Sequence, residues 1–189
     1  MKYLLTPKHI IDCVSSDTIS DHTVVIDDNK IENIIPNNAV GDSIYSSYEH
    51  LEFPNGTLMP GFIEMHSHMH ISGDHENYEQ LITENDETLL IRASAAVRSA
   101  LLSGVTTMRD LGAKNSISLA IRAACQQDMI PGPTMIIAGA PITTTGGHCH
   151  MFGIEVNTKD EVVKAVRDQF HAGVDWIKIM ATGGNFTPG

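Results

Sequence analysis

The segment Leu58-Met59-Pro60-Gly61-Phe62-Ile63-Glu64-Met65-His66-Ser67-His68-Met69-His70 joins a Pro-Gly turn to a short apolar run that ends in alternating histidines. Side chains two positions apart lie on the same face of a strand, so His66 and His68 are expected to point the same way. At the rise of a strand their spacing is about 6–7 Å, which allows both imidazoles to bind one metal ion. The pattern alone also fits two histidines that stand two positions apart by chance, on the surface or in the core, and bind no metal.

Before this segment the sequence is typical of short strands. Residues 23–27 and 30–35 flank Asp28-Asn29, which predicts a β-hairpin, and residues 49–53 form a further β segment. No helical period is present. We predict that residues 1–59 form part of a small β-sandwich, because so few strands rarely make a stable sheet domain alone.

From residue 60 to residue 189 the sequence alternates between strand and helix patterns. The predicted strands are residues 61–65, 105–109, 134–138 and 176–180, and residues 72–86 are predicted to be a loop. Apolar residues recur at helical spacing from Leu89 to Leu101, and Gly104 stops this helix. Four parallel strands with helical crossovers make half of a (β/α)8 barrel. An open doubly wound sheet is the alternative, but no Gly-x-Gly-x-x-Gly follows a strand.

The two later helices carry capping signals. Ser116 is predicted to cap a helix with the apolar face Ile117, Ala120, Ile121, Ala124 and Cys125. Thr158-Lys159-Asp160-Glu161 is a capping box, and Gly173 ends the helix that it opens. The residues predicted to face inward from this second helix are Val162, Val163, Val166 and Phe170.

Composition excludes several classes of protein. The 189 residues include 12 basic and 23 acidic side chains, a net charge of −11 with no basic run, so nucleic acid is not an expected partner. No apolar run approaches the roughly 20 residues of a membrane span, and the apolar stretch at the start is too short for us to expect a signal peptide. The three cysteines show no Cys-x-x-Cys spacing, so we expect no disulfide framework and a cytoplasmic location.

In a parallel barrel the functional residues lie where strands end, and two more sites qualify. Lys178 lies between Trp176-Ile177 and Ile179-Met180. Burial would lower its pKa, and the neutral amine could capture carbon dioxide as a carbamate that bridges two metal ions. Alternatively its stem packs and its head reaches solvent. The Gly-rich loop 143–150 offers His148 and His150 for substrate binding, unless these histidines are incidental.

These motifs, taken in order, resemble the amidohydrolase superfamily along the whole chain. The resemblance rests on Pro-Gly-Phe-Ile-Glu-Met-His-Ser-His (60–68), Gly-Val-Thr-Thr-Met-Arg-Asp (104–110) and Trp-Ile-Lys-Ile (176–179). Thr-Gly-Gly-His (145–148) and Lys-Ile-Met-Ala-Thr-Gly-Gly (178–184) make the chain most similar to imidazolonepropionase-related and Xaa-Pro dipeptidase-like members.

The resemblance implies a binuclear metal centre, usually zinc, that hydrolyses a small-molecule amide or a dipeptide. It assigns His66 and His68 to the more buried metal ion and carboxylated Lys178 to the bridge between two ions. Glu64 stands where the family usually has Asp, at a position that supports the turn. Two further histidines and the general base, an Asp, come from later strands in the family, so we expect the base beyond Gly189 and this chain to be the N-terminal part of a longer protein, inactive alone.

Two other functions are open alternatives. A mononuclear deaminase would generally lack the lysine on the fourth strand. A truncated, non-catalytic chain would bind metal or a partner only. Unpaired edges at residues 61–65 and 176–180 also lead us to expect a homo-oligomer.

Overall fold

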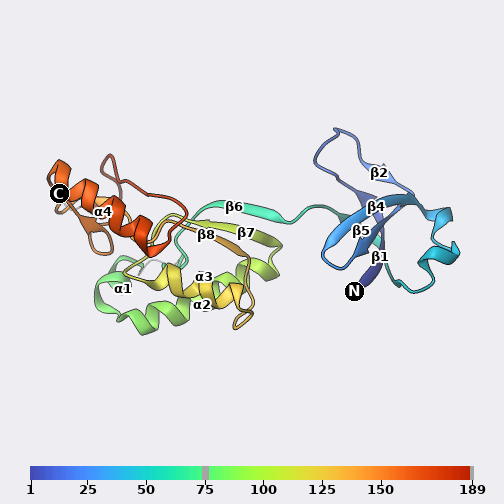
Figure 1. Ribbon diagram of the computed structural model, residues 1–189, viewed down its shortest axis with the longest axis horizontal. Coiled ribbons are helices and arrows are strands. Elements are labelled where there is room, and N and C mark those ends of the chain that lie inside the picture. Colours follow the sequence, from blue (N-terminus) through green and yellow to red (C-terminus); the bar gives the residue numbers. More distant parts are fainter. Residues whose placement is uncertain (74–76, 188–189) are drawn as a thin grey trace. The chain divides into compact units, whose positions relative to one another are not determined.

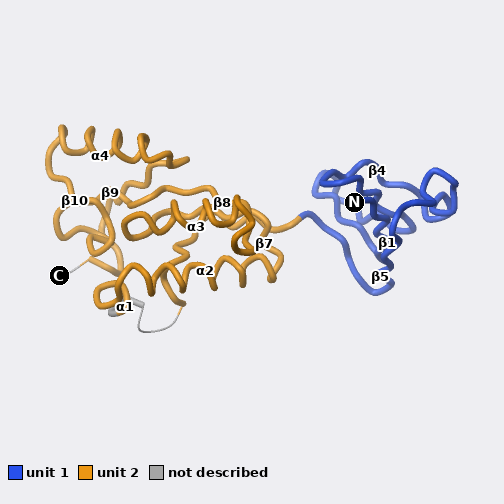
Figure 2. Tube along the Cα trace, turned by 60° about the horizontal axis from the view of Figure 1, so that its bottom comes forward, with its two compact units in different colours: residues 1–60 blue, residues 61–189 orange. Residues whose placement is uncertain are grey.

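The computed structural model describes residues 1–73 and 77–187, which fall into two compact units (Figure 1). The units are Met1–Pro60 and Gly61–Gly189, coloured separately in Figure 2. Each contains its own sheet and its own buried apolar cluster. None of the described helices is both long and apolar enough to cross a membrane.

The first unit is a five-stranded sheet in which β1 is central. Its strands are β1 (Lys2–Ile10), β2 (Ile19–Ser20), β3 (His22–Asp27), β4 (Lys30–Pro36) and β5 (Glu49–Leu58), with 3-10 turns η1 (Asn37–Ala39) and η2 (Ser43–Tyr45) before β5. β1 is antiparallel to β2 and β3 and parallel to β5. The predicted hairpin is confirmed, because Asp27 pairs with Lys30 across Asp28-Asn29. β5 runs beyond its predicted end because Thr57 and Leu58 pair with the end of β1.

The second unit is built on the parallel sheet β6-β7-β8, in chain order. Its elements are β6 (Phe62–Ser67), α1 (Asn77–Thr83), α2 (Asp86–Leu102), β7 (Val105–Asp110), α3 (Ile117–Gln126), β8 (Thr134–Ile137), β9 (Ile142–Thr143), β10 (Ile154–Glu155) and α4 (Lys159–Ala172). Figure 1 shows α2 and α3, the two crossover helices, on the same side of this sheet. Together the units form an α/β fold, the first part of a TIM-like barrel after part of a β-sandwich.

The crossover helices bury one face each against the sheet. Leu89, Ala93 and Val97, at the predicted helical spacing, are completely buried on α2. They share one apolar cluster with Ile121 of α3 and Ile137 of β8. Burying such side chains contributes roughly 1.5–3 kcal/mol each for Leu, Ile or Val, so this cluster fixes the ends of the strands that carry the site.

Helix ends agree with the sequence at three places and differ at one. Gly104 follows α2 with φ +93°, and Gly173 ends α4 with φ +84°, both in conformations that favour glycine. The capping box of α4 is formed in both directions between Thr158 and Glu161. Ser116 stands at the N-cap of α3 as predicted, but its side chain does not make the expected capping hydrogen bond.

Two local predictions are corrected by packing. Part of the predicted loop 72–86 is helix α1, because Leu81 is inserted into the core and is 1% exposed; residues 74–76 of that loop lie outside the described chain. On α4, Val162 and Val166 pack inward as predicted, but Val163 is 40% exposed and Phe170 is 80% exposed.

The predicted fourth strand, residues 176–180, is reduced to a single parallel bridge between Ile142 and Ile179. The segment still lies beside β9, since the Ile142 N–H donates to the Lys178 carbonyl at 2.8 Å and the Met180 N–H to the Ile142 carbonyl at 2.9 Å. A continuous ladder is interrupted because Pro141 has no N–H and Gly139 has φ +66°.

Candidate metal centre

His66 and His68 lie at the end of β6, where the alternation predicted them. Their ring centroids are 5.5 Å apart, with the rings inclined at 62°. His66 is exposed and His68 is partly buried. The Glu64 carboxylate accepts the His66 backbone N–H at 2.8 Å, so it supports the backbone of this turn.

The imidazole of His68 is held by one backbone carbonyl. Its Nδ1 lies 2.8 Å from the Gly112 oxygen. A carbonyl only accepts, so Nδ1 carries the proton and Nε2 keeps a free lone pair, the arrangement found in histidines that bind metals. Gly112 has φ +139°, and a Cβ there would lie 2.8 Å from Cδ of Pro141. Only glycine fits this carbonyl's position.

Asp110, the last residue of the motif at 104–110, anchors the same loop from inside the core. It is completely buried at the end of β7, and its Oδ1 accepts the Met69 N–H at 3.3 Å. Burial raises the pKa of Asp110 to about 7, although the backbone N–H groups of Met69 and Gly112 oppose this rise. The carboxyl therefore ties the residues after β6 to those after β7.

The other predicted residues act on His68 electrostatically. Burial lowers the pKa of His68, the hydrogen bond to Gly112 opposes this change, and electrostatic interactions with His66, Lys178 and His148 lower the pKa a little further. The neutral imidazole that results is the form that binds a metal ion. Lys178 also acts on the thiol of Cys149. The predicted burial around Lys178 is wrong, since Trp176 is 53% exposed and Ile179 is 56% exposed.

His70, the third histidine of the alternation, lies inside the core. It is completely buried, and its ring meets the edge of Phe152 with centroids 5.0 Å apart. Neither ring nitrogen has a hydrogen-bond partner among the described residues. Burial, with smaller effects from the charges of nearby basic side chains, lowers the pKa of His70 to about 3, so it is neutral at physiological pH.

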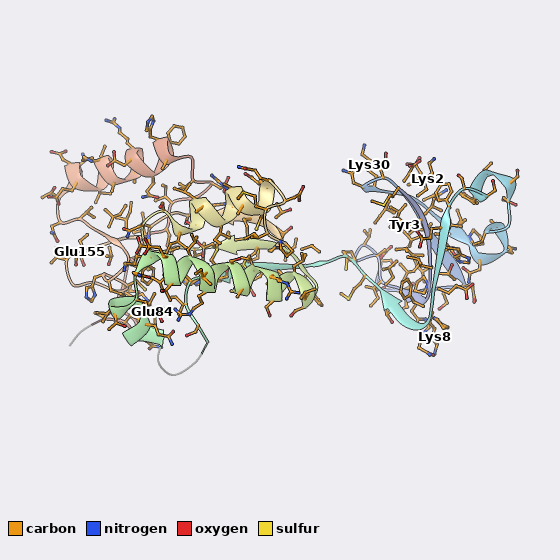
Figure 3. All side chains as sticks on the ribbon, turned by 90° about the horizontal axis from the view of Figure 1, so that it is seen from below. Lys2, Tyr3, Lys8, Lys30, Glu84 and Glu155 are labelled. Carbon is orange, nitrogen blue, oxygen red and sulfur yellow. The ribbon has the colours of Figure 1, made fainter. Side chains whose placement is uncertain are left out.

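The loop 143–150 presents one of its two histidines to this site. Glu155, labelled in Figure 3, accepts the Gly146 N–H at 2.7 Å and fixes the loop. His148 stacks on Phe186, with centroids 5.9 Å apart and planes at 12°. His150 instead turns back to the Gly147 carbonyl, 3.2 Å from its Nδ1. Both stay predictions as substrate ligands, but His148 has the better position.

A cavity of about 620 Å³ adjoins His68. It is lined by residues from the end of β6, the loop 143–150 and the segment 184–186: His68, Ile71, His148, Cys149, Phe152, Gly184, Asn185 and Phe186. Cys149 is a poor nucleophile there, since burial raises the pKa of its thiol to about 11. The cavity can therefore hold a ligand beside His68 without offering a reactive thiolate.

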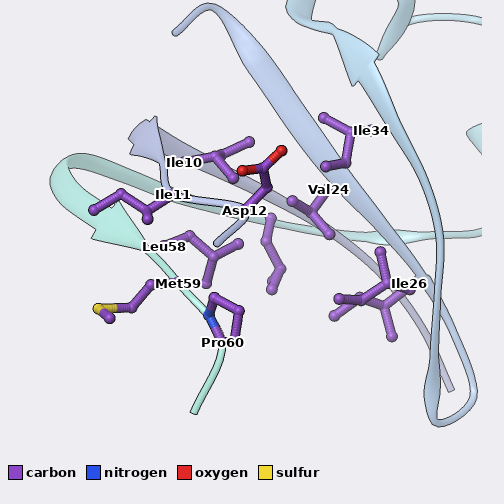
Figure 4. A pocket seen from close by; sticks show the side chains of 11 residues that line it. Ile10, Ile11, Asp12, Val24, Ile26, Ile34, Leu58, Met59 and Pro60 are labelled. Atoms are coloured by element: carbon purple, nitrogen blue, oxygen red, sulfur yellow. The ribbon is translucent and has the colours of Figure 1, made fainter. Parts of the chain in front are cut away.

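A second hollow, in the first unit, carries no comparable chemistry. Its volume is about 270 Å³, and apolar side chains such as Ile10, Val24 and Leu58 converge on it (Figure 4). Its one acidic residue, Asp12, already accepts the N–H groups of Val14 and Ser15, each at 3.0 Å. Nothing in this hollow can bind a metal ion or activate water.

The donors around His68 fit part of a metal centre. In residues 1–73 and 77–187, no three His, Cys, Asp or Glu side chains converge as a metal cluster. The local set is instead two imidazoles with the Lys178 amine, and that amine would contribute an oxygen donor only as a carbamate. Two imidazoles, one of them fixed through Nδ1, suit zinc and related divalent ions.

Replacing Gly112 by alanine is expected to weaken metal binding by about 10–100-fold, the range seen when the residue supporting a metal-binding histidine is lost. The added methyl group would collide with Pro141 and displace the carbonyl that orients His68. Calorimetric titration with zinc measures the affinity. Gly73→Ala is the matched control, because a Cβ there meets nothing within 4 Å. Equal affinities for the two variants would contradict this role of Gly112.

A parallel sheet with helical crossovers and candidate functional residues at its strand ends is typical of barrel enzymes. The Amidohydrolase family model matches residues 57–189, and the chain belongs to this family.

Individual relatives are similar over part of their length. Ochratoxinase from Aspergillus niger is 27% identical over an alignment of 155 residues, with 67% of this chain and 31% of that protein covered. The crystal structure of a Xaa-Pro dipeptidase with methionine bound in its active site is 28% identical, with TM-score 0.83, covering 97% of this chain and 48% of that one. An amidohydrolase crystal structure is 25% identical, with TM-score 0.84, covering 100% and 48%. This chain spans about a third to a half of these relatives.

Proposed function

We propose that this chain provides the first part of the active site of a metal-dependent amidohydrolase that cleaves an amide C–N bond in a small molecule or dipeptide. One observation carries the proposal: His68, neutral and fixed through Nδ1 to Gly112, lies beside His66 at the mouth of a cavity. Family membership and the similarity to a Xaa-Pro dipeptidase support an amide as the substrate.

Each predicted residue has a role in this proposal. His66 and His68 would hold one divalent ion through their imidazoles, and Lys178, as a carbamate, would bridge it to a second. Such ions, zinc in our proposal, polarise a scissile carbonyl and make water more acidic. The stacked His148 would orient the substrate at the cavity, and the buried Asp110 would hold the loop behind His68.

Metal analysis combined with an amidase assay tests this function. We expect the protein, isolated from its natural source with its mass determined, to contain two metal ions per chain. It should hydrolyse dipeptides or N-acyl amino acids, lose activity with a chelator and regain it with zinc. One ion per chain together with ammonia release would instead indicate a mononuclear deaminase. Stable metal binding with no hydrolysis of any amide would indicate a non-catalytic chain.

A further inference from the structure

We propose that the cavity beside His68 selects substrates whose group next to the scissile amide is uncharged and apolar, with an aromatic ring as the best fit. This inference rests on the proposed function, since it names the substrate class of the same site. The cavity has a volume of about 620 Å³, within the 300–1,000 Å³ typical of small-molecule sites, so it can hold an aromatic side chain and an amide together.

One wall of the cavity is a fixed aromatic ring. Phe152 is 4% exposed, and its ring packs against His68 at a centroid distance of 6.0 Å with an interplanar angle of 65°. His70 packs against the same ring at 80°. Beside it, the Ile71 N–H donates to the His68 carbonyl at 3.0 Å, which places a second apolar side chain next to the candidate metal ligand.

A second wall is the stack of Phe186 on His148. The turn that carries Phe186 is closed by Thr187, whose hydroxyl accepts the Gly184 N–H at 2.8 Å and whose N–H donates to the Gly184 carbonyl at 3.0 Å. Gly184 permits this approach, because a Cβ there would lie 2.6 Å from Cε1 of His148. The ring of Phe186 is thus held at the cavity by backbone geometry.

Among the residues that the structure describes, no Asp, Glu, Lys or Arg lines the cavity. Its ionisable groups are two histidines and the Cys149 thiol, which stays protonated. Lys178 is committed to the metal centre in the proposed function. A charged substrate group would therefore lose water without gaining an ionic partner. An aromatic group would gain edge contacts with the two rings, worth about 0.5–1.5 kcal/mol per pair.

Dipeptides with Ala on one side of the amide and Phe, Leu, Glu or Lys on the other, in both orders, test the inference. With the variable residue on one of the two sides of the amide, kcat/KM for the Phe and Leu peptides should exceed that for the Glu and Lys peptides at least about tenfold. This ratio is expected when an apolar group is compared with a charged group that finds no ionic partner. The affinities of the same peptides for the metal-free protein, measured by calorimetry, should show the same ranking, with Phe and Leu above Glu and Lys.

Phe186→Ala should reduce the preference for Phe over Glu several-fold while leaving the metal content unchanged. Phe170→Ala is the matched control, since Phe170 is 80% exposed and does not line the cavity. Equal binding and hydrolysis of the Phe and Glu peptides would overturn the inference. Selective binding without hydrolysis of any peptide would instead sustain the inference and count against the proposed function.

Discussion

Replacing His68 by alanine is expected to weaken zinc binding at least about 100-fold, more than the 10–100-fold typical of losing an outer partner of a metal ligand. The variant lacks the Nε2 donor, and the exposed His66 alone cannot hold the ion. In the described residues no cluster of three His, Cys, Asp or Glu side chains is formed that could hold the ion in its place. Isothermal titration of the metal-free protein with zinc measures the change.

Two controls separate metal binding from folding. His9→Ala removes a histidine of the first unit that contacts Ser20, and it should leave zinc affinity unchanged. His68→Gln keeps a polar side chain that can still donate to the Gly112 carbonyl, so it should fold like the parent protein and yet bind zinc poorly. Unchanged affinity in both His68 variants would rule out this histidine as a ligand.

Asp110→Asn is expected to stabilise the protein progressively, relative to the parent, as the pH rises. The pKa of Asp110 is about 7 in the folded protein and 3.8 as its ordinary value, so the folded state holds the proton more tightly. Its contribution to stability is therefore fully present below pH 3.8 and is lost as the pH rises through about 7. The asparagine has no charge to bury at any pH.

The expected size follows from the shift in pKa. About three pKa units correspond to roughly 4 kcal/mol, so the variant should gain on the order of 4 kcal/mol over the parent between about pH 4 and pH 8. Denaturation by urea at several pH values measures the difference. Asp28→Asn is the control, because Asp28 is exposed and its pKa is lowered by the N-terminal amine, the opposite direction. A difference for Asp110→Asn that does not vary with pH would refute the prediction.

Local sequence determined the features that depend on a few neighbouring residues. Strand alternation placed His66 and His68 at one strand end, and their rings do lie 5.5 Å apart. The capping box at Thr158 and the glycine at 173 set the ends of α4 as predicted. These features need only backbone sterics and hydrogen bonds within one turn, so they survive in any tertiary context. The order of strands and helices likewise predicted the parallel sheet β6-β7-β8.

Only the tertiary structure decided which distant residues support the site. Asp110, Gly112 and Phe152 carry no motif for metal binding, and their roles arise because the ends of β6 and β7 and the loop after β9 meet. The sequence predicted a full strand at residues 176–180, where the structure has a single bridge. The apolar pattern does not reveal that Gly139 and Pro141 interrupt the neighbouring segment with which this strand would pair. Apolar periodicity tells which side chains favour burial, whereas hydrogen-bond pairing and packing between remote segments decide which are buried and what they hold in place.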